Sequence, residues 1–170
     1  VGTDQGYLFA GWMKSEVAWL IDYDKWVVLI HKAYQVFFRE AETKEAFWEF
    51  WLQHNRHKSV KLLKKRLKDD PEQKQVLNVY WHDRRETIKR LRRLTRVLKK
   101  TGVPSYLTDD ASYAHLRGMV MAGRIRPLLA NLYGTGAMKG IAEVSKKLNI
   151  PLRVLYLSNA EGYWKYKPQF

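Results

Sequence analysis

Residues that could do chemistry form three polar groups, each at the end of a short apolar run: Asp22 and Asp24, the stretch 131–136, and Ser158, Asn159 and Glu161. The runs themselves, 17–21, 125–132 and 152–157, have the length and composition of buried strands in a parallel sheet. Parallel strands bring their carboxyl ends to one edge of a sheet, and ligands bind there. We therefore expect the three groups to line one crevice.

The last group is the candidate catalytic set. Ser158, Asn159 and Glu161 place a hydroxyl, an amide and a carboxylate directly after a strand, which is more than a turn requires. A plain turn is the alternative. Asp24 also precedes an amphipathic helix, so Asp22 and Asp24 either contact a ligand or form a helix cap with a solvated neighbour.

The elements that must position these groups alternate between strand and helix. Apolar residues recur at helical spacing from 25 to 41, another helix follows Thr43, and a helix over 137–148 joins the last two strands. This order predicts the α/β class, with a partial Rossmann-like parallel sheet and a large basic helical insertion.

We expect a single domain over residues 1–170. Its α/β core comprises 1–53 and 101–170, and the basic helical insertion comprises 54–100. The insertion carries twelve of the fourteen net positive charges, which come from 31 Lys and Arg against 17 Asp and Glu. A compact domain that tolerates such self-repulsion is expected to use its field to bind a polyanion.

The segment 84–100 holds nine cations and one acid. A solvated helix face, which is the alternative interpretation, usually mixes both signs. Nucleic acid is favoured over a membrane surface because the apolar stripe of this helix is narrow and aliphatic. The candidate contact residues are Arg84, Arg85, Lys89, Arg92, Arg93 and Arg96.

Several kinds of chemistry are excluded or disfavoured by composition. The chain has no cysteine, so disulfides, zinc–thiolate sites and thiol nucleophiles are excluded. The five histidines are scattered, and His54 and His57, three residues apart, have cationic neighbours and no positioned carboxylate. We predict no metal site.

Five short motifs add a resemblance to a known family: Gly2-Thr3-Asp4-Gln5, Asp22-Tyr23-Asp24, Tyr106-Leu107-Thr108-Asp109, Gly123-Arg124-Ile125 and Tyr156-Leu157-Ser158-Asn159-Ala160-Glu161. Together they resemble a bacterial family that has a methyltransferase-like Rossmann core. The resemblance spans most of the chain, and its most distinctive motif is the last one.

The resemblance implies that S-adenosylmethionine lies across the ends of the first strands. Gly2 and Asp4 would belong to a backbone turn under its methionine part, and Asp22 or Asp24 would accept hydrogen bonds from the ribose hydroxyls. Asn131 stands where the family offers an acid to the adenine amine.

The sequence as a whole predicts a methyltransferase-like domain that binds an adenosyl ligand at its strand ends and nucleic acid through its basic helices. One alternative is a non-catalytic binding module. Another is a nucleic-acid-targeting toxin domain of a larger secreted bacterial protein, with a cognate protein partner. The absence of an initial Met suggests an excised domain, and either the bacterial cytoplasm or delivery as an effector suits the composition.

Overall fold

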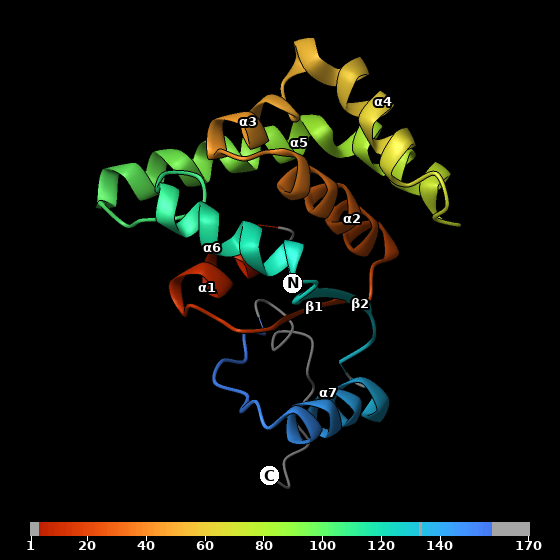
Figure 1. Ribbon diagram of the computed structural model, residues 1–170, viewed down its shortest axis with the longest axis vertical. Coiled ribbons are helices and arrows are strands. Elements are labelled where there is room, and N and C mark those ends of the chain that lie inside the picture. The colour runs from red at the N-terminus through yellow and green to blue at the C-terminus, as the bar shows by residue number, and fades with distance from the viewer. Residues whose placement is uncertain (1–3, 133, 158–170) are drawn as a thin grey trace, which may run out of the picture.

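The computed structural model describes residues 4–132 and 134–157, and most of them are helical (Figure 1). The elements follow one another as α1 (Gln5–Trp12), β1 (Ala18–Asp22), α2 (Lys25–Glu40), α3 (Lys44–Glu49), a short 3₁₀ helix (Gln53–Asn55), α4 (Arg56–Arg66), α5 (Gln73–Thr101), α6 (Asp110–Met121), β2 (Ile125–Leu129) and α7 (Thr135–Leu148). In Figure 1, α4 and α5 lie at one end of the molecule and α7 at the other. Among the described helices, none has both the length and the hydropathy needed to cross a membrane.

Helix α2 forms the centre of the fold because its apolar residues recur at helical spacing. The helix begins where the side chain of Asp24 accepts a hydrogen bond from the backbone N–H of Trp26, at 2.9 Å. This confirms the helix-cap interpretation of Asp24, since a side-chain oxygen at this position satisfies an otherwise unpaired N–H of the first turn. Its buried face presents Tyr34, Phe37 and Phe38 to the helices around it.

Aromatic side chains fill the space around α2. Their rings meet at centroid distances of 4.5–6.2 Å, and we call the fully buried set the aromatic core: Tyr7, Tyr34, Phe37, Phe38, Phe47, Trp51, Tyr80, Tyr106 and Tyr113. Large rings in tilted and stacked pairs bury much apolar area per residue. The aromatic core therefore holds together α1, α2, α3, α5 and α6.

Helix α5 belongs to this core although it lies in the predicted insertion. The buried residues of this helix recur mainly at spacings of three, four and seven residues, so one stripe of the helix faces inward: Val76, Val79, Tyr80, Arg84, Thr87, Ile88, Leu91 and Leu98. The helix ends at Gly102, whose φ of 67° is left-handed, and the N–H of Val103 returns to the carbonyl of Leu98 at 3.0 Å. This is the glycine stop expected from the sequence.

The sheet has two strands among the described residues, so the predicted partial Rossmann-like sheet is wrong. Strands β1 and β2 pair in parallel, in register from Ala18 opposite Ile125 to Asp22 opposite Leu129. The third predicted strand, 152–157, has no regular structure.

Two physical features explain this correction. Pro127 lies in the middle of β2 and has no N–H, and proline within a strand is confined to sheet edges. Leu152, Val154 and Leu155 remain exposed, so the burial that would favour a further strand is missing. Helix-on-helix packing of aromatic rings supplies most of the core instead.

Candidate functional site

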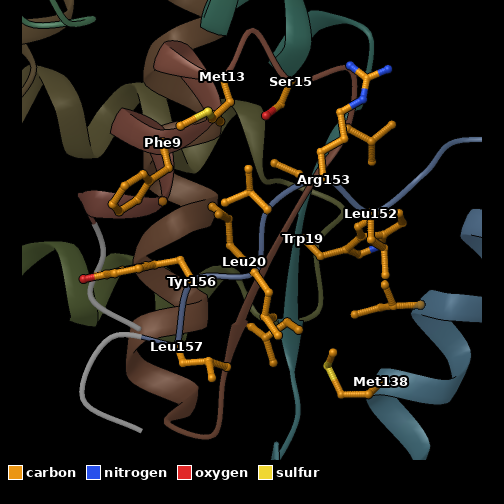
Figure 2. Close-up of a pocket in the computed structure, with 18 of the residues that line it drawn as sticks. Phe9, Met13, Ser15, Trp19, Leu20, Met138, Leu152, Arg153, Tyr156 and Leu157 are labelled. Carbon is orange, nitrogen blue, oxygen red and sulfur yellow. The ribbon is translucent and has the colours of Figure 1, made fainter. Parts of the chain in front are cut away.

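A cavity of about 490 Å³ lies beside β1 and is lined mainly by α1, β1, α7 and the segment 150–157, with a smaller contribution from α2. Figure 2 shows the apolar side chains that surround it: Phe9 of α1, Met13 directly after α1, Trp19 and Leu20 of β1, Met138 of α7, and Leu152, Tyr156 and Leu157 of the segment. The volume falls within the usual range for small-molecule sites, roughly 300 to 1,000 Å³.

The segment 150–157 is held against α1 by specific contacts. The hydroxyl of Tyr156 donates to Oε1 of Gln5 at 2.9 Å, and the rings of Phe9 and Tyr156 lie 4.4 Å apart. The other end of the segment is tied to α7, because the backbone N–H of Ile150 donates to the carbonyl of Ser145 at 3.0 Å. The segment 150–157, which forms one wall of the cavity, therefore makes hydrogen bonds to other elements near both of its ends.

Few polar side chains reach this cavity. Asp22 lies at the end of β1, and Glu16 and Arg153 form an exposed ion pair at 3.7 Å. His31 of α2 also lines the cavity although it is only 2% exposed. Because the rest of the lining is mainly apolar, these groups determine which polar atoms of a ligand could be recognised.

His31 connects the cavity to a buried polar cluster. Its Nδ1 lies 3.0 Å from the hydroxyl of Tyr7, whose ring stacks on Tyr34 with centroids 5.1 Å apart. Tyr34 in turn donates to the carboxylate of Asp4, which is 4% exposed and accepts from Nε of Arg90 at 2.9 Å. Hydrogen bonds, joined by the stacked rings of Tyr7 and Tyr34, thus connect the cavity to α5.

Burial controls the protonation of this cluster. It lowers the pKa of His31 to about 4, against a smaller opposing effect of the Asp22 carboxylate, so the imidazole is neutral at pH 7. Burial, and then the negative charge of Asp4, raise the pKa values of Tyr7, Tyr34 and Tyr106. The phenols therefore remain protonated hydrogen-bond donors.

The structure assigns separate roles to the predicted cofactor residues. Oδ1 of Asp22 accepts a hydrogen bond from the N–H of Asp24 at 2.9 Å, while Asp24 itself caps α2. The N–H of Ala130 donates to the carbonyl of Asp22 at 2.9 Å, so Asp22 and Asn131 lie at the same edge of the sheet. Only Asp22 of these three lines the cavity.

Other predicted site residues lie away from the cavity or outside the described ranges. Asp4 is buried against Arg90 and Tyr34 and is absent from the cavity wall. The other predicted cofactor-binding residue, Gly2, and the predicted catalytic residues fall outside the described ranges: Ser158, Asn159 and Glu161. Among the described residues, the mainly apolar wall does not fit an adenosyl group well: its acids are Asp22 and Glu16, and Glu16 already pairs with Arg153. S-adenosylmethionine stays a prediction.

The predicted nucleic-acid residues divide into one buried side chain and an exposed row. Arg84 is 6% exposed and donates from Nη1 to the carbonyl of Trp51 at 2.7 Å and from Nη2 to Gln53. Its guanidinium therefore makes hydrogen bonds within the protein. The other five candidates are exposed on α5: Arg85, Lys89, Arg92, Arg93 and Arg96.

An exposed tryptophan lies beside this row. Trp81 is 41% exposed on α5, and Cζ of Arg56 from α4 lies 3.9 Å from its ring centroid. The ring of His57 lies 5.9 Å from the same indole. The arrangement places an aromatic surface next to cations, a combination that also occurs where proteins stack the bases of single strands.

Sequence reasoning missed His31 and Tyr7. The signal for His31 was its position within the apolar face of α2, where a polar residue must find a partner or a ligand. Nothing in the local sequence indicates that Tyr7, 24 positions earlier, supplies that partner.

The chain belongs to the family described as Domain of unknown function (DUF7790), whose model matches residues 1–170. No curated protein matches the chain.

Proposed function

We propose that this domain binds a nucleic acid through the exposed cations of α5, with α4 alongside. The observation that carries the proposal is a row of exposed cations with a single acid, Glu86, beside it. Lys89 pairs with Glu86 at 2.7 Å, but no described acid forms an ion pair with the rest of the row: Arg85, Arg92, Arg93, Arg96, Lys99 and Lys100.

Some cations elsewhere in the protein pair with acidic neighbours. Lys32 contacts both Asp70 and Glu72, at 2.7 and 2.8 Å, and Arg66 contacts Glu40 at 2.7 Å. Exposed cations without an ion pair to a described acid also lie on α4 and α7, among them Lys61, Lys64 and Lys139, but α5 carries the longest row of them. The positive field of such a row raises the local concentration of a polyanion and accelerates its binding.

The helical spacing of the row suits an extended anion. Arg85, Lys89, Arg92, Arg96 and Lys99 recur every three or four residues, so they form one stripe about 21 Å long at 1.5 Å per residue. A stripe of this length can contact several successive phosphates. Each phosphate contact releases counterions and contributes affinity that falls with salt.

The exposed surface of α5 favours nucleic acid over a membrane. A helix that lies in a bilayer interface buries a broad apolar face. The large hydrophobic residues exposed on α5 are Trp81 and Val97, which are 16 positions apart. Trp81 beside Arg56 is instead suited to stacking on a base.

The test is to replace Arg92, Arg93 and Arg96 together by Gln and measure binding of labelled RNA and DNA by fluorescence anisotropy over a series of salt concentrations. We expect weaker binding, and a slope of log affinity against log salt that falls by about 0.7 per lost contact on single strands and about 0.9 on duplex.

A matched control removes the same charge from α7 by replacing the exposed Lys139, Lys146 and Lys147 with Gln. This control should keep the wild-type slope. Unchanged binding by the α5 variant, or an equal loss in the α7 control, would overturn the proposal.

A further inference from the structure

We infer that the cavity beside β1 is a second binding site, for a small, neutral, mainly apolar molecule whose hydrogen-bond acceptor pairs with Nε2 of His31. This inference is independent of nucleic-acid binding. The cavity lies among α1, β1 and α7, while the cationic row lies on α5 (Figures 1 and 2).

The wall determines the apolar character of the ligand. The apolar lining side chains come from all four enclosing parts, among them Phe9, Trp19, Met138 and Leu157 (Figure 2). Burying apolar ligand surface against such a wall stabilises the complex by roughly 25 cal/mol per Å² before the cost of association. The volume of about 490 Å³ accommodates a molecule and not merely a few waters.

Charge excludes an ionic ligand. The lining has one fixed cation, Arg153, which already pairs with Glu16 at 3.7 Å, so an anion would find no compensating charge of its own. A cation would have to leave water for the same apolar wall, where Glu16 already pairs with Arg153 and Asp22 already accepts a hydrogen bond from Asp24. A neutral molecule avoids both penalties.

His31 supplies the specific polar contact. Its ring is 2% exposed and lines the cavity, and its Nδ1 is engaged by the Tyr7 hydroxyl at 3.0 Å. Nε2 has no hydrogen-bond partner among the described residues. It is therefore the ring atom left for a ligand.

The tautomer of His31 follows from Tyr7. The Tyr7 side chain is fully buried, and among the described residues its hydroxyl bonds to His31 alone. If Nδ1 were the donor, the phenol proton would be buried without an acceptor, which costs about 1–3 kcal/mol. Tyr7 therefore donates to Nδ1, and the imidazole proton resides on Nε2.

The cavity thus presents the N–H of the buried His31 ring in a mainly apolar surrounding. A water molecule bound there would need two to four polar partners, and few polar side chains line the cavity. A ligand carbonyl or ether oxygen satisfies the donor while the ligand body fills the apolar volume. This chemistry distinguishes the predicted ligand from a nucleoside, which carries many polar groups.

The probe is PRODAN, a neutral naphthalene dye whose ketone accepts hydrogen bonds and whose emission responds to them. N-phenylnaphthylamine, a neutral dye of similar type without a ketone, serves as the comparison. We expect both dyes to bind the wild-type protein with enhanced fluorescence.

Two variants of α7 test the location. Met138→Trp fills the cavity and should weaken PRODAN binding at least tenfold, whereas Leu148→Trp, at an exposed position of the same helix that does not line the cavity, should leave it unchanged. Equal binding by both variants and the wild type, or an equal loss in both, would place the dye on the surface and overturn the inference.

His31→Phe tests the polar contact. Loss of one hydrogen bond should weaken PRODAN about threefold to tenfold and leave N-phenylnaphthylamine within twofold. Equal losses for both dyes would remove the specific role of Nε2. Displacement of PRODAN by S-adenosylmethionine would also overturn the inference, because the site would then accept a charged nucleoside.

Discussion

The aromatic core and the region around the cavity differ in how densely their side chains are packed. Nine large rings fill the space between α1, α2, α3, α5 and α6, and all of them are essentially buried. The sheet region, by which we mean β1, β2, α7 and 150–157, instead has half-buried strands and leaves a cavity of about 490 Å³. The aromatic core therefore maintains the fold, whereas the sheet region leaves space for a ligand.

The largest expected effect contrasts two tryptophans. Trp51 is fully buried, 4.7 Å from the ring of Tyr34 and 5.1 Å from Phe37, so Trp51→Ala should lower the free energy of unfolding by about 3–5 kcal/mol. Trp19→Ala, on the cavity wall, should cost only about 1 kcal/mol because its surroundings are already incompletely packed. Urea denaturation monitored by circular dichroism measures both. Equal losses of unfolding free energy in the two variants would contradict the view that the two regions differ in packing.

His31 stands where the two regions meet, and its titration should make stability depend on pH. The folded pKa of about 4 lies below the ordinary value of 6.5, so between these values the unfolded chain binds a proton that the folded chain does not. Stability contributed by neutral His31 is therefore complete above pH 6.5 and falls by about 3 kcal/mol as the pH drops to about 4.

The measurement is urea denaturation of the wild type and His31→Gln at several pH values. Carboxylates that titrate in the same range contribute to both proteins, so the difference between the curves isolates His31. A constant difference from pH 7 to 4 would show that His31 titrates normally in the folded protein.

Two adjacent arginines of α5 separate a structural from a binding role. Arg84→Ala leaves the buried carbonyl of Trp51 without its donor and should lower the free energy of unfolding by about 2 kcal/mol. Arg85→Ala changes an exposed residue and should alter stability by no more than about 0.5 kcal/mol. In anisotropy measurements Arg85→Ala should nevertheless weaken nucleic-acid binding. The reverse pattern would mean that the exposed cations are not the contact surface.

The smallest effect compares one glycine from each region. Gly118 of α6 and Gly140 of α7 lie in helices, and a Cβ at either position would meet nothing within 4 Å. Alanine at each should raise the free energy of unfolding by about 0.5–1 kcal/mol, because glycine loses more backbone freedom in a helix. A gain at Gly118 without one at Gly140 would indicate that α7 unfolds separately from the aromatic core.

Local patterns were sufficient to predict several elements. The cap at Asp24, the helix that follows it, the start of a helix after Thr43 and the stop at Gly102 are all present in the structure. Each depends on residues within one or two helical turns. The strands β1 and β2 were also predicted, and their parallel pairing brings Asp22 and Asn131 to one edge of the sheet.

The fold class could not be obtained in the same way. A short apolar run such as 152–157 becomes a strand only if a neighbouring edge accepts its hydrogen bonds and both faces are covered. The structure meets neither condition, and Pro127 in the pairing strand was the available warning. The prediction of a Rossmann-like sheet was wrong because a segment forms a strand only where a neighbouring strand can pair with it.

The sequence by itself determined the net charge of +14, the concentration of cations in 84–100 and the helical faces that bury the aromatic rings. Only the tertiary structure decided that Arg84 is buried while Arg85 is exposed, because that depends on where the carbonyl of Trp51, 33 positions earlier, comes to lie. It likewise paired His31 with Tyr7 and enclosed a cavity beside them. Charge and periodicity are local properties of the chain, whereas burial and hydrogen-bond partners arise from contacts between distant segments.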